Sequence, residues 1–259
     1  MLGDLDQENM ILKMVLDYIP TLTYEKKPIL KCLGRTLAED IIAREALPKF
    51  DYSTCDGYAL DSKVTIGVAK DKPKYFKVIG EVCAGAIFDG EVKRNRAVNI
   101  MTGAPIPEGA DCVIPLELAE KQDDLIKISD QIQSGINVRK AGYELAEGSM
   151  VMRSGTTISP LEIGVLASLG RRSIKIIRQP VVSIVATGDE VIPLGGKKSR
   201  GQIFNSNALS IASLVSSYGG TPHIIEVIPD NKYKLQDCIL RSFDSDLVIT
   251  IGGTSNGRS

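Results

Sequence analysis

The spacing of apolar residues changes character three times along this 259-residue chain. Residues 8–19 place apolar side chains three and four positions apart, which predicts an amphipathic helix that Pro20 ends. Its apolar stripe consists of Met10, Ile11, Met14, Val15 and Ile19. A second helical stretch is expected from Pro28 to Leu33, with Gly34 as its break. Extended or loop structure should follow as far as Pro48.

Between residues 62 and 132 the pattern shortens to strand-like runs separated by glycine, proline and aspartate. The runs are KYFKVIGEV, RAVNIM, DCVIPLE and LIKI. Turn signals at such short spacing favour a small all-β module, a barrel or a sandwich, over a doubly wound sheet. The preceding stretch DYSTCDGYAL (51–60) is too polar for a core strand, so we expect an exposed segment there.

A strong helix start occurs at Ser159, because Pro160 occupies the first helical position and Glu162 completes a capping box. Gly170 should end this helix, and RRSIKII then predicts a strand. The expected buried stripe consists of Leu161, Val165, Leu166 and Leu169. This short segment cannot bury itself alone, so we expect it to return to the early 20–48 segment. Its stripe and that of the first helix could also serve dimerisation.

From residue 180 onward, strands and helices alternate. The predicted order is strand VVSIVATG, helix SNALSIASLVSSYGG, strand PHIIEVI, helix YKLQDCILRSF and strand DLVITIGG. Strands that are apolar on both faces indicate a parallel sheet covered by helices. Three strands are half of a doubly wound fold, so this domain is expected to be incomplete at the C-terminus.

The sequence therefore predicts a multi-domain α/β protein. A discontinuous α+β domain would comprise residues 1–48 and 133–178, although the 1–20 helix is also able to pack on the α/β domain. A small barrel-like all-β domain (49–132) would be inserted into it. A three-layer α/β domain with a parallel sheet would follow at 179–259.

Composition excludes several classes of function. Lys+Arg number 31 and Asp+Glu 32, a formal net charge of −1, so no global field favours nucleic acid or an anionic membrane. The five cysteines contain no C-x-x-C pair, and His223 is the only histidine, which disfavours a zinc site or a Ser-His-Asp triad. No apolar run is long enough for a membrane span, and the N-terminus lacks signal-peptide features. A cytoplasmic location is expected.

Three loops follow the carboxyl ends of the predicted parallel strands, where ligands bind in such sheets: TGDEV (187–191), PDN (229–231) and GGTSNG (252–257). Asp189, Glu190 and Asp230 supply the oxygen ligands that Mg²⁺ prefers, and the glycines allow a phosphate to approach the backbone. Each loop alone could equally be a turn or a helix cap. GGTSNG matches neither a Walker A loop nor a dinucleotide fingerprint.

Three other segments carry candidate chemistry. Asp56-Gly57 is either a turn or a catalytic acid, and MTGAPIPEGAD is either a rigid turn or a device that presents Thr102. INVRKAGYELAEG is either a solvated turn or a source of cations for an anionic ligand, with Arg139, Lys140 and Glu144 as its charged candidates.

Six runs in order then carry a resemblance. They are ALPKFDYSTCDGYAL, NIMTGAPIPEGADCVIPLE, INVRKAGYELAEG, SIVATGDEV, FNSNALSIASLV and ITIGGTSNG. Together they resemble the molybdopterin molybdenumtransferase family, called MoeA in bacteria and represented in animals by the E domain of gephyrin. The resemblance implies an elongated homodimer with a cleft between subunits and a molybdopterin-binding α/β domain. The implied enzyme inserts molybdate into adenylylated molybdopterin with Mg²⁺ and releases AMP, with a molybdopterin adenylyltransferase as a candidate partner.

The resemblance also implies roles for individual residues. The catalytic candidates are Asp56, Thr102, Glu144, Glu190 and Asp230, and Asp56 and Glu190 are the candidate Mg²⁺ ligands. The substrate-binding candidates are Gly57, Gly103, Arg139, Thr187, Gly188, Asp189, Asn207, Gly252, Gly253, Thr254 and Ser255. Glu144 departs from the family, since many members have Asp there. Members also continue beyond the glycine-rich loop, through the rest of the α/β domain and a further β-domain.

Two other functions are compatible with the same residues. The segment from 180 onward alone resembles a molybdopterin adenylyltransferase domain, although the long N-terminal part argues against that activity. A non-catalytic dimeric scaffold of the gephyrin E-domain type would use the same fold. Molybdate and tungstate have similar charge and size, so either metal is compatible with the composition.

Overall fold

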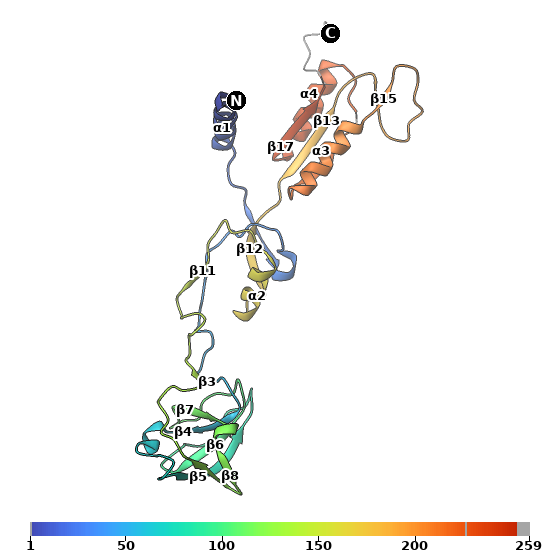
Figure 1. The fold of residues 1–259 in the computed structure, drawn as a ribbon. Helices are drawn as coiled ribbons and strands as arrows, with labels where there is room; N and C mark the ends of the chain where they lie inside the picture. The colour runs from blue at the N-terminus through green and yellow to red at the C-terminus, as the bar shows by residue number, and fades with distance from the viewer. Residues whose placement is uncertain (1, 226, 253–259) are drawn as a thin grey trace. The chain divides into compact units, whose positions relative to one another are not determined.

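The computed structural model describes residues 2–225 and 227–252 (Figure 1). The chain is a mixed α/β protein that divides into two compact units. Residues 41–152 form one, here called the central unit, and residues 1–40 together with 153–259 form the other, the flanking unit. The flanking unit is therefore built from two separated stretches of chain.

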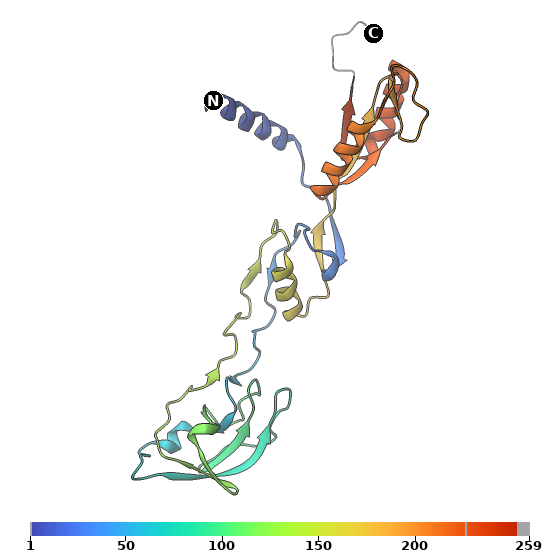
Figure 2. The same cartoon turned by 45° about the vertical axis from the view of Figure 1, so that its right-hand side comes forward.

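The central unit contains a β-sheet, drawn in cyan to green in Figure 2. Its six strands have the order β7-β4-β6-β5-β9-β8. Its strands are β4 (Gly57–Leu60), β5 (Lys74–Val82), β6 (Arg96–Ile100), β7 (Cys112–Pro115), β8 (Glu120–Gln122) and β9 (Leu125–Ile128). Neighbours pair antiparallel except β5 and β6, which are parallel. Short 3₁₀ helices η2 (Ser62–Thr65) and η3 (Leu116–Leu118) follow β4 and β7. The four strand runs predicted between residues 74 and 128 are confirmed.

Strand β4 corrects the expectation that residues 51–60 avoid the core. Gly57 to Leu60 are all buried, and β4 lies between β6 and β7 within the sheet. The polar residues of DYSTCD occupy the loop and the short strand β3 (Tyr52–Ser53), and the apolar GYAL that follows is too short to show a period. Its burial comes from two hydrogen-bonded neighbours, which lie far away in the sequence.

Both faces of this sheet are covered. Alternate residues along β4 and β7 enter two apolar clusters, one around Leu60 and Phe76 and the other around Val98 and Ile100. Cys112 is fully buried, and burial raises the pKa of its thiol to about 12. That cysteine is therefore a packing residue and not a reactive one.

Two short antiparallel ladders extend the central unit beyond the sheet. Strand β3 pairs with β10 (Val138–Arg139), and β2 (Ile41–Ile42) pairs with β11 (Met150–Met152). The chain thus enters this unit through β2 and leaves it through the adjacent β11.

In the flanking unit, β1 (Tyr24–Pro28) pairs antiparallel with β12 (Ser173–Ile177). This pairing confirms that the RRSIKII strand returns to the early segment. Between Pro28 and Leu33 the predicted helix is wrong, since Pro28 ends β1 and only the 3₁₀ turn η1 (Ile29–Lys31) follows. Pro28, the expected first residue of that helix, instead pairs with Ser173 in the β1–β12 ladder.

Helix α2 (Pro160–Ser168) begins as predicted, with both hydrogen bonds of its capping box present. The Ser159 N–H donates to the Glu162 carboxylate at 2.8 Å, the Ser159 hydroxyl accepts the Glu162 N–H, and it also accepts the Leu161 N–H at 3.1 Å. The predicted buried stripe is wrong at its first position, because Leu161 is exposed and Leu166 is the fully buried member. Leu166 is the buried residue of this nine-residue helix.

Helix α1 (Leu2–Tyr18) confirms the predicted N-terminal helix and begins earlier than its apolar stripe suggested. All five stripe side chains, from Met10 to Ile19, are at least half exposed. None of the helices in the described part of the chain has the length and hydropathy needed to cross a bilayer.

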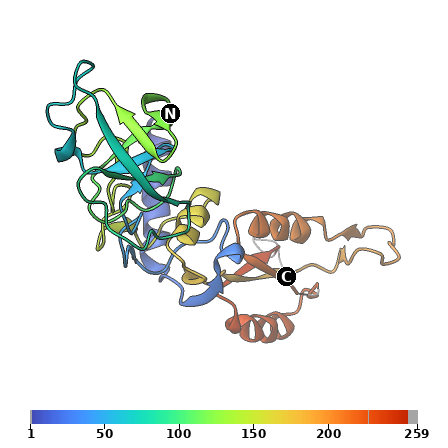
Figure 3. The ribbon, with the colours of Figure 1, turned by 90° about the horizontal axis from the view of Figure 1, so that it is seen from below.

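The last part of the chain forms a parallel sheet, as the alternation of elements predicted, and its strand order is β16-β13-β17. Its strands are β13 (Val181–Ala186), β16 (Thr221–Ile224) and β17 (Leu247–Ile251). Helices α3 (Ser206–Ser217) and α4 (Lys232–Arg241) lie on opposite sides of it (Figure 3), and the 3₁₀ turn η4 (Ser242–Asp244) precedes β17. Ala208 and Ala212 of α3 are buried against Val182 and Ile184.

A pair of two-residue strands, β14 (Val191–Ile192) and β15 (Ile203–Phe204), was not anticipated. They pair in parallel and enclose the loop 193–202, which contains Lys197, Lys198 and Arg200. The ammonium group of Lys198 lies 5.8 Å from the centre of the Phe204 ring. Strands this short have no detectable period in the sequence.

A charged joint links β12 to the parallel sheet. Both terminal nitrogens of Arg178 donate to the carboxylate of Asp246, which also accepts the Val181 N–H at 2.8 Å. The Arg178 guanidinium, followed by the Val181 N–H, lowers the pKa of Asp246 to about 2. These bonds hold the ends of two sheets together.

Candidate functional site

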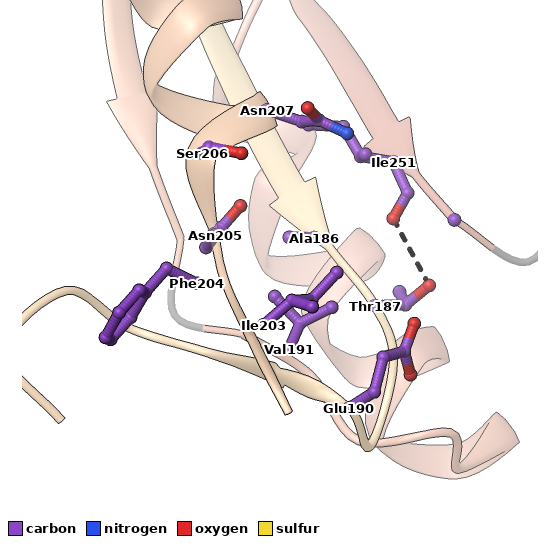
Figure 4. A pocket seen from close by; sticks show the side chains of 11 residues that line it. Ala186, Thr187, Glu190, Val191, Ile203, Phe204, Asn205, Ser206, Asn207 and Ile251 are labelled. Atoms are coloured by element: carbon purple, nitrogen blue, oxygen red, sulfur yellow. Dashed lines mark hydrogen bonds between the residues drawn. The ribbon is translucent and has the colours of Figure 1, made fainter. Parts of the chain in front are cut away.

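A pocket of about 200 Å³ opens at the carboxyl edge of the parallel sheet (Figure 4). It lies where the ends of β13 and β17 meet β14, β15 and the start of α3. Its lining consists of Ala186, Thr187, Glu190, Val191, Ile203, Phe204, Asn205, Ser206, Asn207, Ile251 and Gly252. In open parallel sheets this edge is the usual place for a ligand.

Hydrogen bonds join the first of the three loops to the residues that lead into the other two and to Asp230. The Thr187 N–H donates to the Ile251 carbonyl at 2.9 Å, and the Gly188 N–H donates to the Ile228 carbonyl at 3.1 Å. The Asp230 N–H donates to the Asp189 carboxylate at 3.2 Å. The expected meeting of these loops is thus confirmed for the described residues.

Two glycines allow this close approach. A Cβ on Gly188 would lie 2.7 Å from a carboxylate oxygen of Glu190, and Gly188 has a φ of +137°. A Cβ on Gly252 would lie 2.8 Å from the Thr187 carbonyl oxygen, at a φ of +102°. At Gly252 a larger residue would push its loop away from the Thr187 backbone, whereas at Gly188 it would strain the backbone and displace the Glu190 side chain.

Glu190 supplies the acidic group of the pocket. Its carboxylate is exposed and accepts no hydrogen bond or ion pair from the residues that the structure describes. Figure 4 shows it beside Thr187, whose hydroxyl donates to the Ile251 carbonyl at 3.4 Å. A carboxylate with free lone pairs is available to a cation or to a hydrogen-bond donor of a ligand.

Asn207 also lines this pocket, in agreement with its place among the substrate-binding candidates. The neighbouring Asn205 and Ser206 were not anticipated. Asn205 caps α3, its side-chain oxygen accepting the Ala208 N–H at 3.3 Å. Its position directly before an apolar helical run is a capping signal that could have identified it. The candidates Gly253, Thr254 and Ser255 lie outside the described residues.

A second acidic site lies in the central unit. One carboxylate oxygen of Asp56 accepts both the backbone N–H and the hydroxyl of Thr102, each at 2.7 Å. The hydrogen bond from the Thr102 N–H, followed by that from its hydroxyl, lowers the pKa of Asp56. The structure therefore joins two candidates that are 46 residues apart.

The glycines next to this pair have structural reasons of their own. A Cβ on Gly57 would lie 2.0 Å from the Ile114 carbonyl oxygen, so the β4–β7 ladder admits only glycine there. Gly103 has a φ of +81°, and its N–H donates to the Ser53 carbonyl at 2.8 Å. Neither glycine requires a ligand to explain it.

The remaining candidates of the central unit lie on the β10–β11 side. The Arg139 guanidinium stacks 4.0 Å from the centre of the Tyr143 ring, and Arg139 pairs with Tyr52 in the β3–β10 ladder. Glu144 is exposed, and its backbone N–H donates to the Leu47 carbonyl at 3.0 Å. No described hydrogen bond joins either side chain to Asp56 or Thr102.

Asp51, the other acid in DYSTCD, is structural. Its carboxylate accepts the Ala141 N–H at 2.8 Å and pairs with the Lys140 ammonium at 2.7 Å. Burial raises the pKa of Asp51, but the hydrogen bonds from Lys140 and Ala141 outweigh burial and lower it overall. Lys140, a candidate cation, is therefore already paired.

The donor set agrees with Mg²⁺ only if the substrate supplies part of the coordination. The described residues hold no group of three or more His, Cys, Asp or Glu side chains suited to a metal ion. Mg²⁺ is commonly held by one or two carboxylates together with substrate phosphates and water. The free carboxylate of Glu190 fits that pattern.

The parallel sheet and its pocket define a class of ligand-binding domain, and residues 183–259 match the family model "Probable molybdopterin binding domain". Residues 7–170 match the family model "MoeA N-terminal region (domain I and II)". That second match covers more than half of the chain, so the chain belongs to the MoeA family.

Named relatives agree with this family. The molybdopterin molybdenumtransferase of Bacillus subtilis is 36% identical over 230 residues, which are 87% of this chain and 54% of that protein. The protein of the same name from Staphylococcus aureus strain MSSA476 is 36% identical over 228 residues, which are 88% of this chain and 54% of that protein. The chain thus spans about half the length of the curated relatives it matches.

Solved structures agree as well. A crystal structure of the molybdopterin biosynthesis MoeA protein from Pyrococcus horikoshii is similar with a TM-score of 0.88 and 30% identity, covering 93% of this chain and 62% of that one. A second structure of the MoeA protein from this species has a TM-score of 0.84 and 31% identity, covering 95% of this chain and 65% of that one.

Proposed function

We propose that this chain serves the insertion of molybdate into adenylylated molybdopterin, with Mg²⁺ and release of AMP. The observation that carries the proposal is the pocket at the carboxyl edge of the parallel sheet, where Thr187, Glu190 and Gly252 line one cavity. That cavity lies within the part of the chain that matches a molybdopterin binding domain. Related proteins of this family are named for the same transfer.

The pocket residues have different roles in binding, and each role follows from the chemistry of the residue. Gly188 and Gly252 let the phosphate of the substrate approach backbone N–H groups, which suit an oxyanion. Glu190 and the Thr187 hydroxyl face the same cavity and orient the linkage that is broken. Bound Mg²⁺ would neutralise and polarise the pyrophosphate, with Glu190 as its carboxylate ligand.

Molybdate enters this scheme as a substrate. It is a dianion, so acidic side chains repel it, and backbone N–H groups and cations suit it better. Arg139 is a suitable cation, because its guanidinium stacks on Tyr143 and forms no ion pair among the described residues.

The exposed carboxylate of Asp56 and its donor Thr102 form the second part of the proposal. We assign to this pair the role of a preformed anionic site that acts on the same substrate. Asp230 and Glu144 are assigned supporting roles. A homodimer with a cleft between its subunits, a molybdopterin adenylyltransferase partner and the three-domain organisation expected from the sequence also belong to this proposal.

Calorimetry tests the pocket directly. Adenylylated molybdopterin is titrated with Mg²⁺ into the wild-type chain, the Glu190→Gln variant and the Asp244→Asn control. Asp244 is an exposed acid that precedes β17, at the amino edge of the same sheet. Binding that is weakened only by Glu190→Gln supports the proposal, and equal affinity in all three proteins contradicts it.

A further inference from the structure

Ser53 is a buried polar residue to which the proposed function assigns no role. It is fully buried, with an exposed fraction of 0%. Its hydroxyl donates to the Cys55 carbonyl at 2.5 Å and accepts the Cys55 N–H at 3.3 Å. These two bonds fix the turn that leads directly into Asp56.

The backbone of the same residue holds the other loop of the site. The Ser53 N–H donates to the Ala104 carbonyl at 3.0 Å, and the Ser53 carbonyl accepts the Gly103 N–H at 2.8 Å. Thr102 is the residue directly before Gly103. One buried residue therefore contacts the loop that carries Asp56 and the loop that carries Thr102.

The remaining constraints on Asp56 lie on its C-terminal side. The Asp56 carbonyl accepts the Leu116 N–H at 3.2 Å, and Gly57 is pressed against the Ile114 carbonyl. These contacts belong to the β4–β7 ladder and do not involve Ser53. The turn from Ser53 to Cys55 is thus the N-terminal support of the acid. It is held by the Ser53 hydroxyl together with the Thr54 N–H, which donates to the Asn137 carbonyl at 3.0 Å.

We propose that Ser53 is a positioning residue, whose hydroxyl sets the turn that places the Asp56 carboxylate on the two donors of Thr102. The inference rests on the proposed function, in which Asp56 and Thr102 act on the substrate. Ser53 itself is sealed from solvent. Its effect on turnover passes through the Asp56–Thr102 pair.

Ser62 offers a matched control in the same unit. It is 5% exposed, and its hydroxyl donates to the Asp111 carboxylate at 2.7 Å. Ser53→Ala removes one buried hydroxyl with its two hydrogen bonds to Cys55, and Ser62→Ala removes one buried hydroxyl with its bond to the Asp111 carboxylate. Both variants should lower the midpoint of thermal unfolding. Only one of them lies beside the proposed site.

The first test follows the Thr102 amide proton by NMR in the 259-residue chain. In Ser53→Ala we expect its signal to move upfield and its exchange with solvent to become about tenfold faster, because the bond to Asp56 is loosened. Ser62→Ala should leave this signal unchanged. A Thr102 signal that is the same in Ser53→Ala and wild type overturns the proposal. If Ser53→Ala is unfolded, Ser53→Cys, which keeps a weak donor of similar size, should show the same change at smaller amplitude.

The second test measures turnover in the full-length protein. Ser53→Ala should lower kcat about ten- to a hundredfold with KM nearly unchanged, whereas Ser62→Ala should change neither. Equal kcat in the two variants overturns the catalytic part of the inference. An active Asp56→Ala protein, by contrast, would contradict the proposed function while the NMR result on Ser53 still stands.

Discussion

The two acidic sites of this chain are prepared in different ways. In the central unit, Asp56 is held by two hydrogen bonds from one threonine, which lower its pKa before any ligand arrives. In the flanking unit, the Glu190 carboxylate lines a pocket and has no bonding partner among the described residues. A fixed acid costs little to orient when a substrate binds, whereas a free acid keeps its lone pairs for a cation.

The difference follows from the scaffolds. Asp56 is attached to an inner strand of a six-stranded sheet, so its backbone is held by ladders on both sides. Glu190 lies in a loop that is held by backbone bonds to neighbouring strand ends and by β14–β15 pairing. The Glu190 side chain at the edge of the parallel sheet is therefore free to adapt, whereas the Asp56 side chain at the central sheet is held rigidly.

The largest expected effect comes from deleting the acids themselves. Asp56→Ala and Glu190→Ala, each made in the full-length protein, should abolish molybdenum transfer, which we take as a loss of more than about a hundredfold. Both side chains are exposed, so the fold should remain intact. Molybdenum insertion into the cofactor is measured, with circular dichroism as the control for folding. Normal insertion by either variant would show that the replaced acid is not part of the site.

Gly57→Ala should destabilise the central unit, which holds the rigid acid Asp56. The new Cβ would lie 2.0 Å from the Ile114 carbonyl, so β4 and β7 must separate, at a cost of about 3 kcal/mol or more. Chemical denaturation measures the change in the free energy of unfolding. Gly164→Ala in α2, where a Cβ meets nothing within 4 Å, is the control and should stabilise by roughly 0.5–1 kcal/mol. Equal effects of the two substitutions would disprove the packing argument.

Thr102→Val should leave the Asp56 carboxylate with fewer hydrogen bonds, and so closer to the unpaired carboxylate of Glu190. It removes the hydroxyl donor and keeps the backbone one, so the pKa of Asp56 should rise part of the way towards its ordinary value. The stability linked to this carboxylate is present above its unfolded pKa and is lost as the pH falls through the folded pKa. That loss should therefore be smaller in the variant. NMR titration of the Asp56 carboxyl carbon measures the shift, and Thr187→Val should leave it unchanged.

The smallest expected effect concerns the Arg178–Asp246 pair, which supports the parallel sheet that carries the Glu190 pocket. Asp246→Asn weakens the paired bonds to Arg178 and should cost about 1 kcal/mol at neutral pH, because solvent screens this pair. The folded pKa of Asp246 is about 2, below its unfolded value, so the difference between wild type and variant should vanish as the pH falls from about 4 towards 2. Thermal unfolding at a series of pH values measures this. A constant difference down to pH 2 would contradict the assignment.

Much of the candidate site could be predicted from local chemistry. TGDEV and PDN follow apolar strands, and parallel strands end at one edge, so the meeting of Thr187 to Glu190 with Asp230 followed from strand order. The contact of Asp56 with Thr102 is different, because nothing within either segment specifies the other. The family resemblance placed both in one site, and only the fold brought their atoms within 2.7 Å.

The sequence by itself determined the elements whose signals are local. The capping box at Ser159, the apolar face of α3 and the strands β5, β6, β13 and β17 depend on the period and end residues of one continuous segment. Tertiary structure alone decided the burial of β4, the loss of the helix expected after Pro28, the exposed stripe of α1 and the place of Ser53 beneath the acid. Each of these depends on partners far along the chain, and a segment of a few residues gains too little free energy from its own hydrogen bonds to choose its conformation without them.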